Sequence, residues 1–426
     1  MNNKMNVLVF PCGSENASEI HEALRYSLHV RIVGASSVSD HGEFLFENYY
    51  GDVPNIKDIE FEPYFKKLVE RENISVVFAT HDTVAVHLAL ICENLGVYLV
   101  NGNPETVQIA RSKRHTYAEF SDQNWVPKVF DSANVSNMDW PVVVKPDLGQ
   151  GGQGVHICCD YQSLNSAIDV TDNPVIVEFL PGNEITVDCF TDRNKKLVWI
   201  GPRTRGRVRA GITMRSESVD SDEPILSIAN ALNERLVLRG PWFFQLKLDK
   251  YNQWKLLEIS CRISGTMVFQ RARGVNLPLM AVHDAMGRDV IPLPSPFVKL
   301  IDRRISTLAF LEFDYKHVYV DLDDTLIIDG NVVPVVIAFL FQCKAQGKFL
   351  YLITRHLTDP AVTLRKAKIE LGMFDEIIHI SDKSFKSTYV KLNSIFIDNH
   401  FPERRDVFSN NNVPVFDVDA IQFLIR

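Results

Sequence analysis

One segment limits the possible folds of this chain more than any other. Val142–Val144 is an apolar run that ends in Lys145, and a loop with glycines at 149, 151, 152 and 154 follows it. The valines predict a buried strand, and the glycines would let backbone N–H groups approach phosphate oxygens closely. Lys145 adds positive charge beside that loop. The order matches neither the P-loop nor the Rossmann fingerprint. Read alone, the segment could also be a flexible hairpin that binds nothing.

Further apolar runs after residue 106 predict an α+β domain with a largely antiparallel sheet. Val175–Leu180 and Ile185–Phe190 read as strands, and Phe243–Leu248 and Leu256–Ile259 read as two strands joined by a turn. In that pair, Gln245 and Glu258 can point to one face. Oxygen ligands on adjacent strands suit a magnesium ion held against nucleotide phosphates.

Residues 1–105 have a different pattern, in which short apolar runs alternate with helical segments. This alternation predicts a small, doubly wound domain whose parallel sheet is covered on both faces. The predicted strands are Met5–Phe10, Val30–Val33, Ser75–Ala79 and Val97–Val100.

Taken in order, these features resemble the ATP-grasp family, in particular its carbamoyl-phosphate-synthetase-like and biotin-carboxylase-like branch. The resemblance covers residues 1–300, with 106–300 as the ATP-grasp domain, and implies ATP and Mg²⁺ as cofactors. It implies that Arg262 lies near the transferred phosphate and that Gln245 and Glu258 hold the metal. The residues it implies for ATP binding are Lys113, Lys145, Gly149, Gly151, Gly152, Gly154, Glu178, Phe179, Leu180 and Glu184. Two positions depart from the family pattern: Ser260 stands where asparagine is common, and Ser112 where aspartate often precedes the lysine.

Four arginines alternate along the segment 203–209, at positions 203, 205, 207 and 209. On a strand, alternate side chains point to the same face. We therefore expect Arg205, Arg207 and Arg209 to bind an acidic substrate. A solvated edge strand or a set of ion pairs between domains is the alternative.

The C-terminal part of the chain contains a second chemical pattern. Val318–Val320 reads as a strand that ends in Asp321 and Asp323, and two later strands end in Thr354 and Asp398. Side chains at the carboxyl ends of parallel strands meet in the crevice where ligands bind. One carboxylate there can attack phosphorus while a second protonates the leaving oxygen.

Residues 316–426 resemble the haloacid dehalogenase superfamily of phosphatases. The resemblance implies that Asp321 is the nucleophile, Asp323 the general acid and base, and Thr354 a phosphoryl ligand. It implies Lys383 as the charge-balancing lysine, with Lys386 as the second choice, and Asp321, Asp323 and Asp398 as the magnesium site. Asn399 stands where a second acid is common. Neither inter-motif segment is long enough for a cap domain, so we expect a capless Rossmann-like fold with an open site.

Composition agrees with a multidomain α/β protein. The 426 residues predict two or three domains, with a linker at 301–315 after a proline-rich stretch at 292–296. A net charge of −8 argues against a protein that coats nucleic acid. The seven cysteines are scattered without a C-x-x-C pair, and no apolar run is long enough to span a membrane. We therefore expect a cytoplasmic protein with reduced thiols.

Together these patterns predict a bifunctional enzyme. Its front part would join an acidic carboxylate to an amine with ATP, and its rear part would hydrolyse a phosphorylated metabolite of the same pathway. Two other functions stay open for the front part: release of an acyl phosphate or carbamoyl phosphate, and nucleotide sensing that regulates the phosphatase. A homodimer is also open. The sequence does not identify the substrates.

Overall fold

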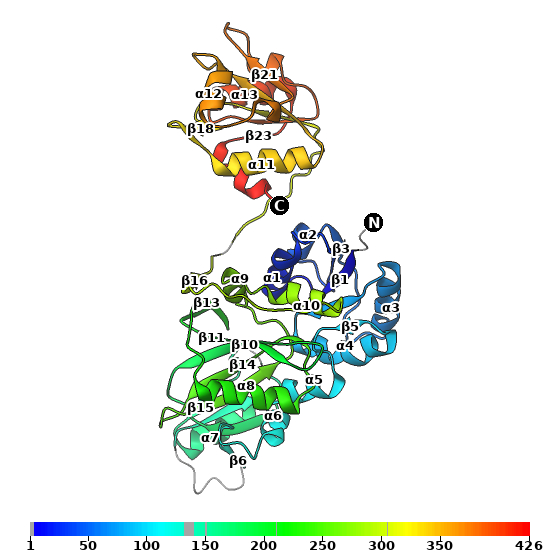
Figure 1. Ribbon diagram of the computed structural model, residues 1–426, viewed down its shortest axis with the longest axis vertical. Coiled ribbons are helices and arrows are strands. Elements are labelled where there is room, and N and C mark those ends of the chain that lie inside the picture. The colour runs from blue at the N-terminus through cyan, green and yellow to red at the C-terminus, as the bar shows by residue number, and fades with distance from the viewer. Residues whose placement is uncertain (1–3, 132–139, 150, 210, 305) are drawn as a thin grey trace. The chain divides into compact units, whose positions relative to one another are not determined.

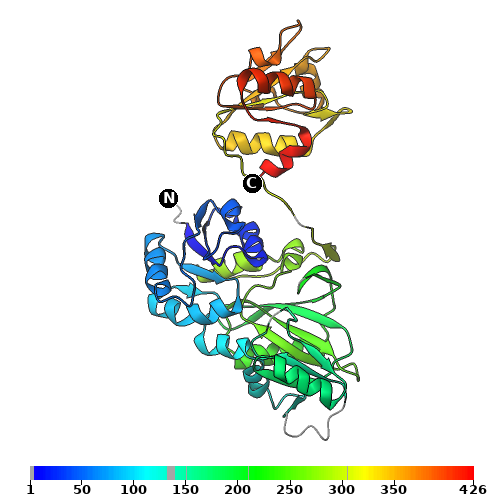
Figure 2. The same cartoon turned by 180° about the vertical axis from the view of Figure 1, so that it is seen from behind.

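The computed structural model describes residues 4–131, 140–149, 151–209, 211–304 and 306–426. The chain separates into two units, Met1–Arg304 and Ile305–Arg426. Figures 1 and 2 show the elements of each unit from opposite sides. Both units combine helices with sheets, which confirms the predicted mixed α/β class.

The first unit begins with a five-stranded parallel sheet in the order β3-β2-β1-β4-β5. Its strands are β1 (Met5–Phe10), β2 (Val30–Ala35), β3 (Asn48–Tyr50), β4 (Val76–Ala79) and β5 (Tyr98–Leu99). Its helices are α1 (Glu15–Leu24), α2 (Gly42–Leu45), α3 (Phe61–Arg71), α4 (Asp82–Leu95), α5 (Pro104–Arg111) and α6 (Lys113–Glu119). On β1, Val7 and Val9 pack with α1, whereas Leu8 and Phe10 pack with α3 and α4. Both faces are covered, which explains the continuous apolar run.

Two helices begin at the carboxyl edge of this sheet, and each has a side-chain cap. The Ser14 hydroxyl accepts a hydrogen bond from the Ala17 N–H at the start of α1. The His81 ring accepts one from the Thr83 N–H at the start of α4. Because caps fix where a helix starts, Ser14 and His81 place the first turns of α1 and α4 at the same sheet edge.

The middle of the first unit contains two four-stranded antiparallel sheets. One has the order β6-β9-β7-β8, and the other has the order β11-β10-β14-β15. The strands are β6 (Val129–Phe130), β7 (Val142–Pro146), β8 (His156–Cys158), β9 (Pro174–Glu178), β10 (Glu184–Thr191), β11 (Leu197–Thr204), β14 (Gly240–Leu248) and β15 (Trp254–Ser260). Helix α7 (Tyr161–Val170) packs on the first sheet and α8 (Glu223–Arg235) on the second.

A three-stranded sheet and two helices complete the unit. The sheet has the order β12-β13-β16, with β12 (Arg207–Arg209), β13 (Ile212–Glu217) and β16 (Leu300–Asp302). Helix α9 is Val268–Ala272, and α10 (Leu277–Ala285) packs back onto the parallel sheet beside α1. The predicted linker at 301–315 therefore begins inside β16, because residues 300–302 pair with β13.

The second unit is built on a five-stranded parallel sheet in the order β21-β20-β17-β22-β23. Its strands are β17 (His317–Val320), β18 (Ile327–Ile328), β19 (Asn331–Val332), β20 (Phe349–Thr354), β21 (Glu376–His379), β22 (Ser394–Ile397) and β23 (Val415–Phe416). Its helices are α11 (Pro334–Ala345), α12 (Pro360–Lys366) and α13 (Phe401–Asn411), with 3₁₀ turns η2 (Leu371–Met373), η3 (Lys386–Thr388) and η4 (Val418–Leu424). Val318 and Val320 face one core and Tyr319 the other. Between Asp323 and β20, the structure has only the hairpin β18–β19 and α11.

Six of the seven cysteines are buried. All seven have free thiols, and only Cys159 is exposed. Burial raises the pKa of Cys92 to about 12, so this thiol stays protonated at neutral pH. Over the described ranges, none of the helices has the length and apolar composition that crossing a membrane requires.

Candidate functional site

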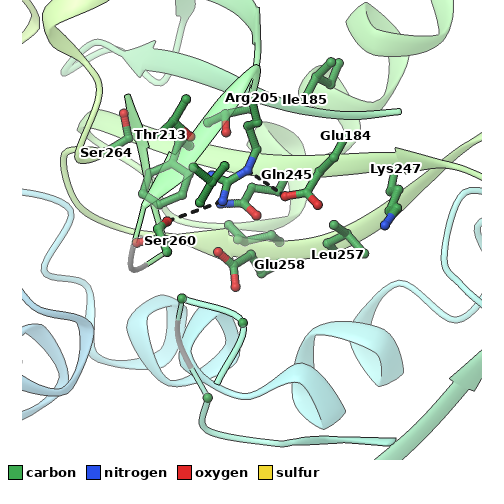
Figure 3. A pocket seen from close by; sticks show the side chains of 18 of the residues that line it. Glu184, Ile185, Arg205, Thr213, Gln245, Lys247, Leu257, Glu258, Ser260 and Ser264 are labelled. Atoms are coloured by element: carbon green, nitrogen blue, oxygen red, sulfur yellow. Dashed lines mark hydrogen bonds and ion pairs between the residues drawn. The ribbon is translucent and has the colours of Figure 1, made fainter. Parts of the chain in front are cut away.

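A cavity of about 1340 Å³ lies in the first unit, where the parallel sheet, both antiparallel sheets and the β12–β13 hairpin converge. The starts of α1 and α4 line one side of it, through Ser14 and Asp82 among others. Residues of the strands β7 to β15 and of the glycine loop line most of the rest. Figure 3 shows Gln245 of β14 and Glu258 of β15 beside Glu184 of β10 and Arg205.

Two lysines line this cavity at the end of β7 and the start of α6. The Lys113 amine donates to the backbone oxygens of Pro146 and Asp147, at 3.1 and 3.0 Å. The Lys145 amine is buried and donates to the Tyr117 hydroxyl at 2.7 Å. Burial, with a contribution from the nearby Lys113 charge, lowers the pKa of Lys145 to about 7. This part of the cavity is therefore suited to an anion, which would favour the charged form of Lys145.

That shifted pKa gives a test of the expectation that Lys145 contacts ATP phosphates. At pH 8 the unbound Lys145 is mostly neutral, and a phosphate group beside it would raise its pKa again. Binding of ATP without magnesium should therefore take up nearly one proton at pH 8. Calorimetry in two buffers of different ionisation enthalpy measures this uptake. Lys145→Met should abolish it, and equal uptake by wild type and Lys145→Met would contradict the assignment.

Ser112, one of the two departures from the family pattern, has a structural role beside these lysines. Its hydroxyl accepts a hydrogen bond from the His115 N–H as the cap of α6, and it lies 2.9 Å from both carboxylate oxygens of Asp147. The Arg114 N–H also donates to Asp147, at 2.8 Å. These contacts fix the first turn of α6, and with it Lys113, against the residues that precede the glycine loop.

The glycine loop needs backbone conformations that other residues rarely adopt. Gly151, Gly152 and Gly154 have φ values of 62, 75 and 69°. A Cβ atom on Gly211 would lie 2.7 Å from the Gly151 Cα. The close approach of the glycine loop to the β12–β13 turn therefore requires glycine at position 211. Gly149, Gly151 and Gly152 line the cavity, whereas the predicted ligand Gly154 does not.

The residues predicted to contact the nucleoside also line the cavity. Glu178 is the last residue of β9 and is followed by Phe179 and Leu180. The Lys128 N–H donates to the Glu178 carboxylate at 2.8 Å, and the Glu178 N–H donates to the Lys128 oxygen at 3.0 Å. Glu184, at the start of β10, also lines the cavity, and its carboxylate lies 2.7 Å from the Arg205 Nε atom.

The two residues predicted to hold magnesium are brought together. Gln245 on β14 and Glu258 on β15 are direct cross-strand partners, and both side chains line the cavity (Figure 3). Burial raises the pKa of Glu258, although the Lys113 charge opposes this. None of the described residues forms a hydrogen bond or ion pair with the Glu258 carboxylate. A half-buried carboxylate that lines a cavity without a partner suits a cation.

Arg262 and Ser260 converge on Asp82, a residue that the sequence analysis did not single out. The Asp82 carboxylate accepts from the Ser260 hydroxyl at 2.5 Å and from the Arg262 Nε at 3.0 Å. Burial alone would raise the pKa of Asp82, but Arg262 and Ser260 hold it below its usual value. The sequence does contain a signal for Asp82 as a site residue, since it follows the carboxyl end of the predicted strand Ser75–Ala79. Ser260 thus links β15 to α4.

The arginine segment requires a correction, because it is not one strand. β11 ends at Thr204 and β12 begins at Arg207. Arg203 is buried and donates to Asp188 at 2.7 Å. Arg205 lines the cavity but pairs with Glu184. Arg207 and Arg209 are exposed and do not line the cavity, and Arg207 pairs with Asp302. The structure therefore does not place these arginines in one row, and substrate binding by Arg205, Arg207 and Arg209 stays a prediction.

Comparison with known proteins identifies the architecture of this unit. A family model described as "ATP-grasp in the biosynthetic pathway with Ter operon" matches residues 171–304. N5-carboxyaminoimidazole synthetase from Staphylococcus aureus, solved with ADP, aligns with a TM-score of 0.58 at 14% identity, over 69% of this chain and 80% of that one. The first unit has an ATP-grasp fold. We call Met1–Arg304 the ATP-grasp unit below.

Two further solved structures agree with the ATP-grasp fold. L-amino acid ligase from Bacillus licheniformis aligns with a TM-score of 0.54 at 19% identity, over 67% of this chain and 75% of that one. The biotin carboxylase domain dimer of 2-oxoglutarate carboxylase from Hydrogenobacter thermophilus, in complex with MgADP, ADP and bicarbonate, aligns at 0.55 and 15% identity, over 68% and 71%. A search of curated proteins found no match. The haloacid dehalogenase resemblance of residues 316–426 stays a prediction.

In the second unit, two predicted carboxylates meet a lysine at the carboxyl edge of the sheet. The Lys386 amine lies 2.7 Å from both Asp321 Oδ1 and Asp398 Oδ2. All three side chains are buried. Burial raises the pKa of Asp321, against the effect of the Lys386 charge. Burial alone would lower the pKa of Lys386, but Asp321 and Asp398 together raise it.

Lys386, not Lys383, is therefore the lysine of this site. Lys383 is exposed, in a turn whose backbone oxygens at Asp382 and Ser384 accept hydrogen bonds from Arg355. Lys386 begins the turn η3 and is its buried residue. The resemblance favours Lys383 as the charge-balancing lysine, but in the structure Lys386 is the lysine that contacts Asp321 and Asp398.

The remaining predicted residues surround this cluster. Thr354 is buried at the end of β20, and its hydroxyl accepts from the His356 N–H at 3.1 Å. The Asp323 carboxylate contacts His356 rather than Lys386. The Thr325 hydroxyl donates to the Asn399 side-chain oxygen and accepts from the Asn399 backbone N–H. Within the described part of the chain, no three or more His, Cys, Asp or Glu residues are arranged to hold a metal ion, so the predicted triad of Asp321, Asp323 and Asp398 is not gathered around one point.

Proposed function

We propose that the ATP-grasp unit is an ATP-dependent carboxylate–amine ligase that works through an acyl phosphate. One observation carries the proposal: the half-buried Glu258 carboxylate, with which no described residue forms a hydrogen bond or ion pair, lines the same cavity as Lys113, Lys145 and the glycine loop. That combination provides charge for phosphates and a carboxylate for a cation. The similar structures named as an amino acid ligase and as a synthetase complexed with ADP support this reading.

The proposed reaction has two steps. A carboxylate oxygen of the substrate attacks the γ-phosphorus of ATP, and ADP leaves. The amine nitrogen then attacks the acyl carbon, phosphate leaves, and the nitrogen loses a proton to solvent. Lys113, Lys145 and Arg262 would balance the charge on the phosphoryl oxygens.

Gln245 and Glu258 would hold Mg²⁺ beside the nucleotide phosphates, and their hard oxygen donors fit that ion. When bound, the ion would supply positive charge to the phosphates. The Glu178–Leu180 backbone would contact the adenine edge, and Glu184 the ribose.

The test is ADP formation from ATP with a panel of carboxylates and amines that includes amino acids. Wild type should form ADP and phosphate only when both co-substrates are present. Glu258→Gln should lower that rate more than about 100-fold, because it removes a charged group at the phosphates. The control is Glu234→Gln, the same change at an exposed site on α8. ADP formation that needs a carboxylate but no amine would indicate acyl phosphate release, and ATP binding without turnover would indicate a sensor.

We propose further that residues 316–426 are a phosphomonoesterase. The supporting observation is the buried Lys386 between Asp321 and Asp398. Asp321 would attack phosphorus while Asp323 gives a proton to the leaving oxygen as the ester P–O bond breaks. Asp323 would then take a proton from the water that attacks the aspartyl phosphate, which releases phosphate and restores Asp321. Asp321 and Asp398 have oxygen donors that fit Mg²⁺, which would add positive charge at the phosphate.

Replacing each lysine in turn tests whether Lys386, as the structure indicates, or Lys383, as the resemblance implies, is needed for phosphate release. Lys386→Met should lower phosphate release from an aryl phosphate about 100-fold or more, because it removes the buried charge beside the phosphoryl group. Lys383→Met should leave the rate within about twofold, since exposed substitutions have small effects. Steady-state kinetics on the full chain measure both rates. A large loss for Lys383→Met with little change for Lys386→Met would show that Lys383 is the lysine needed for phosphate release.

A further inference from the structure

We infer that His356 is a positioning residue that orients the Asp323 carboxyl group for proton transfer to the leaving group. The inference rests on the proposed phosphatase function of the second unit. It starts from a contact that the site motifs do not include: the His356 Nδ1 atom lies 2.8 and 3.0 Å from the two carboxylate oxygens of Asp323.

Asp323 needs such a partner more than Asp321 does. The Asp321 side chain is buried and held by Lys386, whereas the Asp323 side chain is 53% exposed. An exposed carboxylate on a loop rotates freely unless another group fixes it. The His356 ring is 17% exposed, and among the described residues no other side chain forms a hydrogen bond or ion pair with the Asp323 carboxylate.

Three elements of the fold hold His356 itself. Its Nε2 atom lies 2.7 Å from the Thr363 hydroxyl on α12. Its N–H donates to the Thr354 hydroxyl at the end of β20, at 3.1 Å. Its backbone oxygen is 2.7 Å from the His379 Nε2 atom at the end of β21. The ring therefore has partners at both nitrogens, and its backbone is fixed beside the predicted phosphoryl ligand Thr354.

These contacts are consistent with one arrangement of protons. The Thr363 hydroxyl donates to His356 Nε2, which leaves the ring proton on Nδ1. Nδ1–H then donates to one oxygen of Asp323. The other oxygen is free to carry the proton that passes to the leaving group. His356 thus touches neither phosphate nor leaving group, and its effect is on the orientation of Asp323.

The test compares two phosphate esters on the full-length protein. An alkyl phosphate has a poor leaving group that needs protonation, whereas 2,4-dinitrophenyl phosphate leaves with little help from an acid. His356→Leu removes the donor. We expect it to lower kcat/KM for the alkyl ester about 10- to 100-fold more than for the dinitrophenyl ester, the range found when an outer partner of a site residue is lost. His356→Asn places an amide donor near the Nδ1 position and should recover most of that difference.

The outcomes separate the two proposals. A wild type that hydrolyses neither ester would overturn the phosphatase function, and the role of His356 with it. An active wild type for which His356→Leu slows both esters equally would overturn the positioning role alone, because lost packing affects both substrates. Failure of His356→Asn to recover more than His356→Leu would also count against the hydrogen bond to Asp323.

Discussion

Asp321→Asn is expected to abolish phosphate release, with a loss of about 10⁴-fold or more in kcat. The amide nitrogen and oxygen of asparagine are far weaker nucleophiles toward phosphorus than a carboxylate. The substitution keeps the shape of a buried side chain, so the fold should survive. The measurement is phosphate release from an aryl phosphate with magnesium, on the full-length wild type and variant.

Asp324→Asn is the matched control for this experiment. Asp324 lies in the same acidic motif but is exposed, and its left-handed φ of 54° is one that asparagine adopts readily. It should retain activity within about twofold, as exposed substitutions do. Equal loss in both variants would mean that the motif acts through local structure rather than through the Asp321 nucleophile.

The second large effect concerns stability. Arg203→Met should destabilise the ATP-grasp unit by about 3 kcal/mol or more, because it leaves a buried carboxylate without its charged partner. Arg203 donates to Asp188 at 2.7 Å and to the Ser264 hydroxyl at 3.0 Å. The Ser264 hydroxyl and the Gln270 amide also donate to Asp188, which keeps the loss at the lower end of the range for buried pairs.

Tryptophan fluorescence during urea unfolding measures this change selectively. All five tryptophans lie before residue 255, so the signal reports on the ATP-grasp unit and not on the second unit. Arg207→Met is the control, since its pair with Asp302 is exposed and should contribute less than about 1 kcal/mol. Similar small losses in both variants would show that the Arg203–Asp188 pair is not energetically important.

Several strands could be predicted because each is a short run of mostly apolar residues. Met5–Phe10 and Val142–Lys145 are apolar runs, and the structure has β1 and β7 at these places. Gln245 and Glu258 could be expected on one face because two strands joined by a short turn fix their own register. Local patterns of this kind do not depend on distant parts of the chain.

Local patterns could not predict the positions of the four arginines at 203–209 or decide between Lys383 and Lys386. Period-2 spacing placed Arg203 with Arg205, Arg207 and Arg209, but the chain turns after Thr204 and Asp188 holds Arg203 inside the core. Lys383 and Lys386 are three residues apart, and only the packing of η3 decides which reaches Asp321. Asp82 and His356 depend on contacts between elements far apart in sequence, so no local pattern pointed to their partners.

The measurement that tests the central claim most directly is oxygen transfer from carboxylate to phosphate. The full-length protein is incubated with ATP, magnesium, an amine and a carboxylate labelled with ¹⁸O, chosen from the panel that supports ADP formation. An acyl phosphate intermediate predicts that one labelled oxygen appears in the released inorganic phosphate, seen as a shifted ³¹P signal. Phosphate formed with ADP but without label would show that water attacks ATP directly, and it would contradict the assignment of the ATP-grasp unit as a carboxylate–amine ligase.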